Sequence, residues 1–299
     1  MIFLVGDNPF HGISHLSQER VRVRGDAATS PDYAAGLVMT SVENGANGFM
    51  FSVSDTTLSI LRIIRQRGNE PLSLYALVPY AYEYVRLATQ VGGISGLAKK
   101  LAGQLVLSAN LKAVAMGLKG VIGADSVALL KAYVSYEVSR IRSAAGKSGK
   151  LESVLLHEII TDLALGLNLN HLFESYVDFM LKLGIKPGFE TRNFSYFVSR
   201  LKELGIDLHD VMIATPFNKV GFQMNPSRSE CEKVLAQVPE SDVIAMSILA
   251  AGYLNLPEAI EYIEGLPNLK GIVVGVSKER HACETFRLLQ KESDNRVRP

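Results

Sequence analysis

Short apolar runs recur along the chain, and nearly every run ends in a small cluster of polar residues. Between the runs, apolar side chains recur every three or four residues, the spacing of a helix that buries one face. The apolar runs cover residues 2–5, 48–51, 72–78, 154–156, 187–189, 211–214, 243–246 and 271–274. Eight short strands that alternate with helices are typical of a closed parallel (β/α)8 barrel, the TIM barrel. We therefore predict a single α/β domain of this type over residues 1–299.

Helix stop signals support this division of the chain. Helices are expected over residues 32–44, 170–184, 194–205, 227–237, 256–265 and 278–291. Gly184 and Gly205 end two of these segments, and glycine commonly ends a helix before the next strand. A further helix, after the second strand, is expected to begin near Ser54 and Asp55, because both residue types favour helix N-caps.

The third and fourth runs are separated by a long gap. Residues 80–152 predict a helical insertion, after which the fourth strand is expected to begin near Ser153. The part from 105 to 130 is apolar and nearly free of charge, so it predicts a cap on the barrel mouth or an interface in a homo-oligomer. A role at a membrane surface is a third alternative, but the lysines in this part are too sparse for a basic amphipathic helix.

Composition and charge exclude several broad classes of function. Lys and Arg number 31 against 30 Asp and Glu, so the chain lacks the clustered basic excess that nucleic-acid binding requires. No apolar run approaches the roughly 18 residues of a membrane span, and the first residues lack the pattern of a signal peptide. The two cysteines, Cys231 and Cys283, fall in predicted helices and indicate no disulfide framework. These features predict a cytoplasmic protein without a membrane span.

Polar residues follow most of the predicted strands. TIM-barrel enzymes carry their active sites at the C-terminal ends of the strands, so these residues are the candidates for a site. The candidates are Asp7, Asn8 and His11 after the first strand, Asp55 after the second, Tyr80 after the third, His157 after the fourth, Glu190 and Asn193 after the fifth, and Asn218 after the sixth. Ionisable groups that converge on one buried mouth are costly unless they are paired, which favours a functional role.

Some of these candidates also fit purely structural roles. The sequence Asp7-Asn8-Pro9 is typical of a turn, and Asp55 fits a helix N-cap as well as it fits a catalytic group. His11 lies four residues before His15, a spacing seen in metal sites on helices, although this segment is expected to be a loop. Glu158 alternates with His157 and fits a position that faces the surrounding helices.

The last strand–helix unit carries a separate signal. The strand at 271–274 runs through Gly275 and Ser277 into a helix that begins near Lys278. Free backbone N–H groups at a helix N-terminus attract anions, and TIM barrels often bind phosphate after strands seven and eight. Gly275, Ser277 and Lys278 therefore predict binding of a phosphate, a carboxylate or the anionic part of a cofactor.

Several stretches resemble one family of barrel enzymes, the aldo-keto reductases. The similar stretches are residues 4–12, 48–56, 155–157 and 271–289, the last of which is the most specific. The resemblance implies a barrel fold, an NADP site in the closing unit, and catalytic roles for Asp55 and His157. The family's Tyr and Lys do not map, because Ser59, Ile60 and Leu61 follow Asp55 and Val78-Pro79 ends the third strand.

Together these patterns predict an enzyme that acts on a small anionic metabolite by acid/base or metal-assisted chemistry. His157 and Glu190 would be the acid/base pair, and Asp7 with His11 would orient the substrate or hold a divalent metal ion. Asn8, Tyr80, Asn193 and Asn218 would contact the substrate. The alternatives are a diverged NADP-dependent oxidoreductase that resembles the aldo-keto reductases, and a non-catalytic barrel that assembles through residues 80–152.

Overall fold

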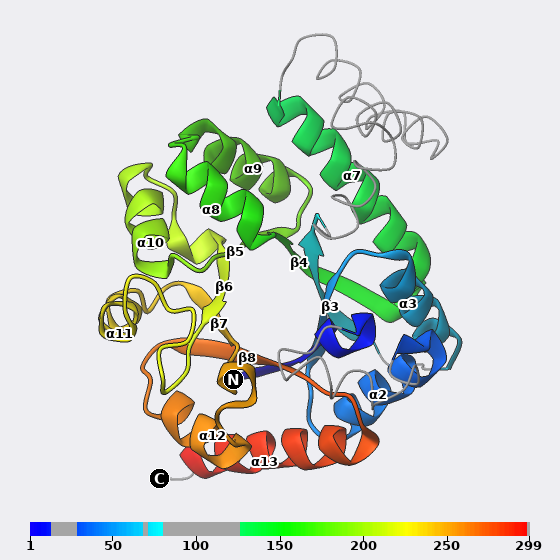
Figure 1. The fold of residues 1–299 in the computed structure, drawn as a ribbon. Coiled ribbons are helices and arrows are strands. Elements are labelled where there is room, and N and C mark those ends of the chain that lie inside the picture. Colours follow the sequence, from blue (N-terminus) through cyan, green and yellow to red (C-terminus); the bar gives the residue numbers. More distant parts are fainter. Residues whose placement is uncertain (13–28, 68–70, 80–125, 298–299) are drawn as a thin grey trace.

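The computed structural model describes residues 1–12, 29–67, 71–79 and 126–297. Its strands form one closed barrel in which each strand pairs in parallel with the next, and β8 pairs with β1 (Figure 1). The strands are β1 (Ile2–Gly6), β2 (Gly48–Ser52), β3 (Leu72–Val78), β4 (Gly149–Leu156), β5 (Lys186–Glu190), β6 (Met212–Pro216), β7 (Asp242–Met246) and β8 (Leu269–Gly275). The predicted TIM barrel is confirmed.

Helices follow the strands and surround the barrel wall (Figure 1). The α-helices are α2 (Pro31–Glu43), α3 (Asp55–Arg67), α7 (Ser126–Ala145), α8 (Glu158–Gly166), α9 (Asn170–Lys182), α10 (Phe194–Glu203), α11 (Arg228–Ala236), α12 (Leu256–Glu264) and α13 (Glu279–Val297). Short 3-10 helices are η1 (Asn8–His11), η3 (Gly146–Ser148), η4 (Leu208–Asp210) and η5 (Ala250–Gly252). Among the described residues, the helices predicted by their ranges are present; α13 continues to Val297 instead of ending at 291, and α8 was not predicted.

One strand boundary differs from the expectation. β4 begins at Gly149, which pairs with Leu72, rather than near Ser153. A register shift between β3 and β4 follows the pairing of Leu74 with Leu151. The first part of β4 was not predicted because its polar residues interrupt the apolar pattern that marks the other strands.

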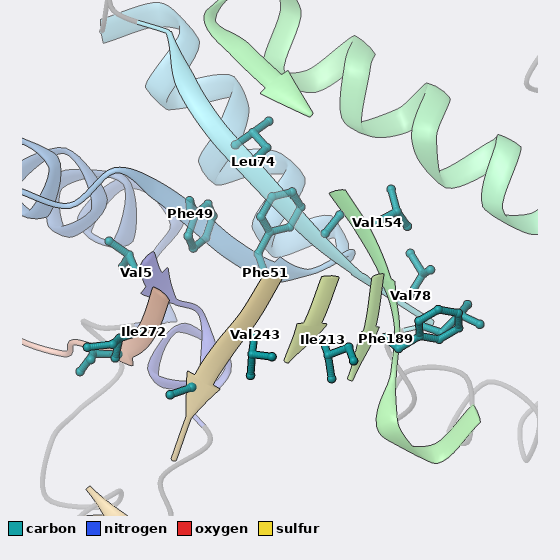
Figure 2. Close-up of a cluster of buried hydrophobic side chains, with 14 of the residues drawn as sticks. Val5, Phe49, Phe51, Leu74, Val78, Val154, Phe189, Ile213, Val243 and Ile272 are labelled. Atoms are coloured by element: carbon teal, nitrogen blue, oxygen red, sulfur yellow. The ribbon is translucent and has the colours of Figure 1, made fainter. Parts of the chain in front are cut away.

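Alternate side chains of the strands pack on opposite sides of the barrel wall. The interior holds Leu4, Met50, Tyr75, Leu77, Leu155, Met212, Ala214 and Ile244. The layer between wall and helices includes Val5, Phe49, Phe51, Leu74, Val78, Val154, Phe189, Ile213, Val243 and Ile272 (Figure 2). The same alternation places His157 and Glu190 toward the interior side, because each follows an interior position by two residues.

An aromatic cluster fixes the ends of β4 and β5. The ring of Phe189 on β5 lies 5.0 Å from that of Phe197 on α10 and 5.4 Å from that of Tyr176 on α9, measured between centroids. The Tyr176 hydroxyl donates a hydrogen bond of 2.7 Å to the carbonyl of Val154 on β4. Both strands are therefore tied to the same cluster directly before their C-terminal ends.

The described part of the predicted insertion is a helix of the outer ring. α7 packs against α3, β4 and α9, and η3 joins it directly to β4. Residues 80–125 lie outside the described residues, so the predicted cap or interface there stays a prediction.

Two expectations from composition can be compared with the structure. Cys231 in α11 is buried and Cys283 in α13 is partly buried, and both are free thiols. Within the described segments, no helix is both long enough and apolar enough to cross a membrane.

We predict that Gly188→Ala on β5 lowers the free energy of unfolding by about 1–3 kcal/mol, because it overpacks the barrel interior. A Cβ at position 188 would lie 2.4 Å from Cγ of Leu155 and 2.8 Å from Oγ of Ser153. Gly166→Ala in α8 is the matched control, since a Cβ there meets no atom within 4 Å. Urea unfolding of both variants checks this packing, and equal stabilities would contradict it.

Candidate active site

His157 follows β4 directly and caps the N-terminus of α8. Its backbone N–H donates a hydrogen bond of 2.8 Å to the carbonyl of Val78 at the end of β3. Its ring Nδ1 accepts the backbone N–H of Ile159 at 3.2 Å. A nitrogen that accepts this bond carries no proton, so the neutral ring has its proton on Nε2. Nε2 lies 3.9 Å from Oε2 of Glu190.

Glu190 ends β5, and its carboxyl group is buried beside His157. The side chain is 11% exposed, and Oε2 accepts the backbone N–H of Glu158 at 3.3 Å. Burial raises the pKa of Glu190 to about 8; the negative charges of Glu158 and Asp7 add to this rise, and Arg192 opposes it. The Glu190 carboxyl group therefore holds its proton for most of the time at pH 7.

The pKa of His157 moves in the other direction. Burial lowers the pKa of the imidazole below its ordinary value, although the nearby carboxylate of Glu158 raises it. His157 and Glu190 are thus both uncharged near neutral pH, and each presents one exchangeable proton. Such opposed shifts in neighbouring groups are a mark of acid/base sites.

Asp7 and His11 form a second histidine–carboxylate pair at the same mouth. Oδ2 of Asp7 lies 3.0 Å from Nε2 of His11 and accepts the backbone N–H of Ser52 at 2.7 Å. Their side chains are 7% and 6% exposed. The charge of Asp7 raises the pKa of both His157 and Glu190, so the two pairs are electrostatically connected.

Three charged residues connect α8 to the loop after β5: Glu158 and Arg192, which follow strands in the sequence, and Asp162, which the sequence did not indicate. Glu158 pairs with the Arg192 guanidinium, which also donates to the side chain of Gln223. Asp162, one turn after Glu158, accepts hydrogen bonds from Thr191 and from the backbone of Arg192. The spacing of Glu158 and Asp162 would have revealed them as partners on one helix face, had a helix been predicted there.

Two predicted site residues have other roles in the structure. The Asp55 carboxylate is 87% exposed at the start of α3 and pairs with Arg140 of α7 at 2.5 Å. The Asn218 side chain closes the loop after β6, because its Nδ2 donates to the carbonyl of Phe222 and its Oδ1 accepts the N–H of Phe222. Both atoms that would recognise a substrate are thus already engaged within the protein.

The remaining candidates after β1, β3 and β5 lie in different settings. Asn8 is exposed on η1. Asn193 precedes α10, where its N–H donates to Oγ1 of Thr191, and its side chain lies near enough to Asp162 to lower the pKa of that carboxyl group. Tyr80 lies outside the described residues.

The predicted anion site begins at the end of β8. Gly275 and Lys278 are exposed, Ser277 is partly buried, and α13 follows directly. A Cβ at position 275 would lie 2.9 Å from Cδ of Pro9, so the turn after β1 packs against this glycine. The predicted anion site is therefore next to the turn that carries Asp7 and His11.

The structure also bears on the metal hypothesis. Among the described residues, no three His, Cys, Asp or Glu side chains lie in one group that could hold a metal ion. Asp7 and His11 supply two such side chains, and they are bonded to each other. Metal binding by this pair stays a prediction.

Comparison with known proteins identifies the fold. Two solved structures of proposed aldo-keto reductases from Pseudomonas aeruginosa are similar to this chain, with TM-scores of 0.58 and 0.59 and 12% sequence identity in each case. Each comparison covers 97% of this chain, and they cover 90% and 89% of the other chains. No protein-family model matches the sequence, and no curated protein matches it. The chain thus has the fold of these proteins and a distant resemblance to the aldo-keto reductases.

Proposed function

We propose that this protein is an enzyme that moves protons on a small metabolite at the C-terminal mouth of the barrel. The observation that carries the proposal is the buried pair of His157 and Glu190, 3.9 Å apart and with pKa shifts that bracket neutral pH. A group that is protonated at pH 7 and ionises near pH 8 is well suited to act as a general acid and, in the return step, as a general base.

The geometry divides the work between the two residues. Glu190 donates its proton to the substrate, and the Nε2–H of His157 faces the carboxylate that this step leaves behind. The backbone N–H of Glu158 stabilises the same carboxylate. Nδ1 of His157 accepts the cap of α8, so the neutral ring acts as a hydrogen-bond donor through Nε2–H, toward the carboxylate that Glu190 becomes.

An anionic group of the substrate would bind away from this pair. The carboxylates of Glu158, Asp162 and Asp7 lie close enough to act on the pKa of His157, and they would repel a second anion. Ser277 and Lys278, directly before α13, offer a hydroxyl group and a cation beside the free N–H groups of the helix start, with Glu279 as the next residue. We propose that they hold the anion while Asp7 and His11 orient the reacting part.

We predict that Glu190→Gln and His157→Ala each lower turnover by about 10²-fold or more, because each removes one half of the proton-transfer pair. The substrate is first found by incubating the purified protein with a panel of phosphorylated and carboxylated metabolites and detecting turnover by NMR. Glu203→Gln, which changes an exposed glutamate on α10, serves as the control and should keep wild-type turnover. Full turnover in His157→Ala would exclude the assignment.

The pH dependence of turnover follows from the same two groups. Activity should fall above about pH 8 as Glu190 ionises, and it should fall at acid pH as His157 gains a charge. Because the pKa of His157 is lowered, the acid limb should lie below the ordinary histidine value of about 6.5. A turnover profile that stays flat from about pH 5 to about pH 9 would contradict this assignment.

A second candidate function is reduction of a carbonyl compound with NADPH. The missing Tyr–Lys pair of the aldo-keto reductases would leave that reaction without a proton source, and the protonated Glu190 beside His157 offers one. Gly275, Ser277 and Lys278 would contact the cofactor at the start of α13. Bound NADPH would supply the hydride, and this chain would supply the proton.

We predict for this second candidate that NADPH binds and changes its fluorescence, and that Lys278→Ala weakens the binding severalfold. Lys270→Ala is the matched control, because Lys270 is an exposed lysine near the start of β8 rather than its end. The absence of any fluorescence change at millimolar NADPH would remove the oxidoreductase and leave the first proposal intact.

A further inference from the structure

Asp162 is a carboxylate of α8 that lies beside the proposed proton-transfer pair without belonging to it. Its Oδ1 accepts the hydroxyl of Thr191 at 2.5 Å, and its Oδ2 accepts the backbone N–H of Arg192 at 3.0 Å. One carboxylate thus binds two consecutive residues of the loop that follows Glu190, and Oγ1 of Thr191 connects it to the backbone N–H of a third, Asn193.

The bond from Thr191 is constrained by its surroundings. Thr191 is completely buried, and its Oγ1 accepts the backbone N–H of Asn193 at 2.9 Å. Its own backbone N–H donates to the carbonyl of Ala214 on β6 at 3.0 Å. The hydroxyl hydrogen is therefore directed to Asp162, and Asp162 is linked through Thr191 to the barrel wall.

Both members of the pair contact the same helix, α8. His157 caps α8 through Ile159, whereas Glu190 belongs to β5 and, within the described part of the chain, bonds to α8 through the backbone N–H of Glu158 at 3.3 Å. This single long bond does not fix the position of a helix. The hydrogen bonds of Asp162, together with the ion pair of Glu158 and Arg192, supply the stronger connection between α8 and the end of β5.

We propose that Asp162 is a positioning residue that sets the separation of His157 from Glu190 by tying α8 to the loop after β5. The inference rests on the proposed function of this pair, and it names the residue that keeps His157 and Glu190 at their observed separation. Asp162 does not touch the reacting atoms, so its effect on the reaction passes through His157 and Glu190.

Asp162 acts on the pKa of His157 in two ways, through its own charge and through the position of α8, and the two effects have opposite signs. The groups that act on its ring are Glu158, Arg192, Asp7, Asp162 and the neighbouring Glu190. The negative charge of Asp162 raises the pKa of His157, so removal of that charge alone would lower the pKa further. Loss of the positioning bonds would instead admit water between α8 and β5, and the pKa would rise toward the ordinary value because burial is what lowers it.

The test is an NMR titration of the His157 ring nitrogens in the full chain, with the signals assigned by their loss in His157→Gln. We predict that Asp162→Asn moves the midpoint upward by about half a pH unit or more. Thr191→Val keeps the charge of Asp162 and removes only one bond to it, so it should also move the midpoint upward. Thr191→Ser retains the hydroxyl and should titrate as the wild type does.

Asp178→Asn is the matched control for charge, because Asp178 is an exposed carboxylate on α9 that pairs with Lys182; it should leave the midpoint unchanged. A midpoint that stays or falls in Asp162→Asn, or that stays in Thr191→Val, would overturn the proposal. If Asp162→Asn does not fold, Thr191→Val decides alone. Turnover is a separate readout, since full activity in His157→Ala would overturn the proposed function and leave the titration result standing.

Discussion

Burial of the Glu190 carboxyl group beside His157 is the constraint on which the mouth of this barrel depends. A carboxylate at this position would lose most of its hydration, and Glu158 and Asp7 add negative charge nearby. The protein keeps the proton on Glu190; Arg192 pairs with Glu158, and Asp7 accepts the backbone N–H of Ser52 and contacts His11. The barrel makes this arrangement possible because β4 and β5 are neighbours and present their ends at one edge.

Much of this arrangement was predictable from the sequence because it follows from strand periodicity. The apolar runs mark the strands, and the residues that follow them must gather at one mouth once the barrel closes. His157 and Glu190 were therefore selected together, and the structure brings them within 3.9 Å. Asp7 and His11 were selected for the same reason, and their direct contact was not foreseen because it depends on the short turn of η1.

The parts that were not predictable depend on side-chain direction and on local helices. α8 escaped prediction because its large apolar residues do not mark one buried face: Ile159 and Leu163 are 50% and 57% exposed. Without that helix, Asp162 could not be recognised as a partner of the next loop. Asp55 and Asn218 follow strands as a site residue would, but Arg140 and Phe222 engage their polar groups, and no sequence periodicity reports such contacts.

The central claim is that Glu190 is a buried acid held beside His157, and the ionisation of its carboxyl group tests it most directly. Carbon NMR of the side-chain carboxyl groups in the full chain, with Glu190 assigned by its loss in Glu190→Gln, gives the titration midpoint without any knowledge of the substrate. We predict a midpoint near the value of about 8 that burial gives to this carboxyl group. A midpoint near 4.5, the ordinary value for a glutamate, would contradict it.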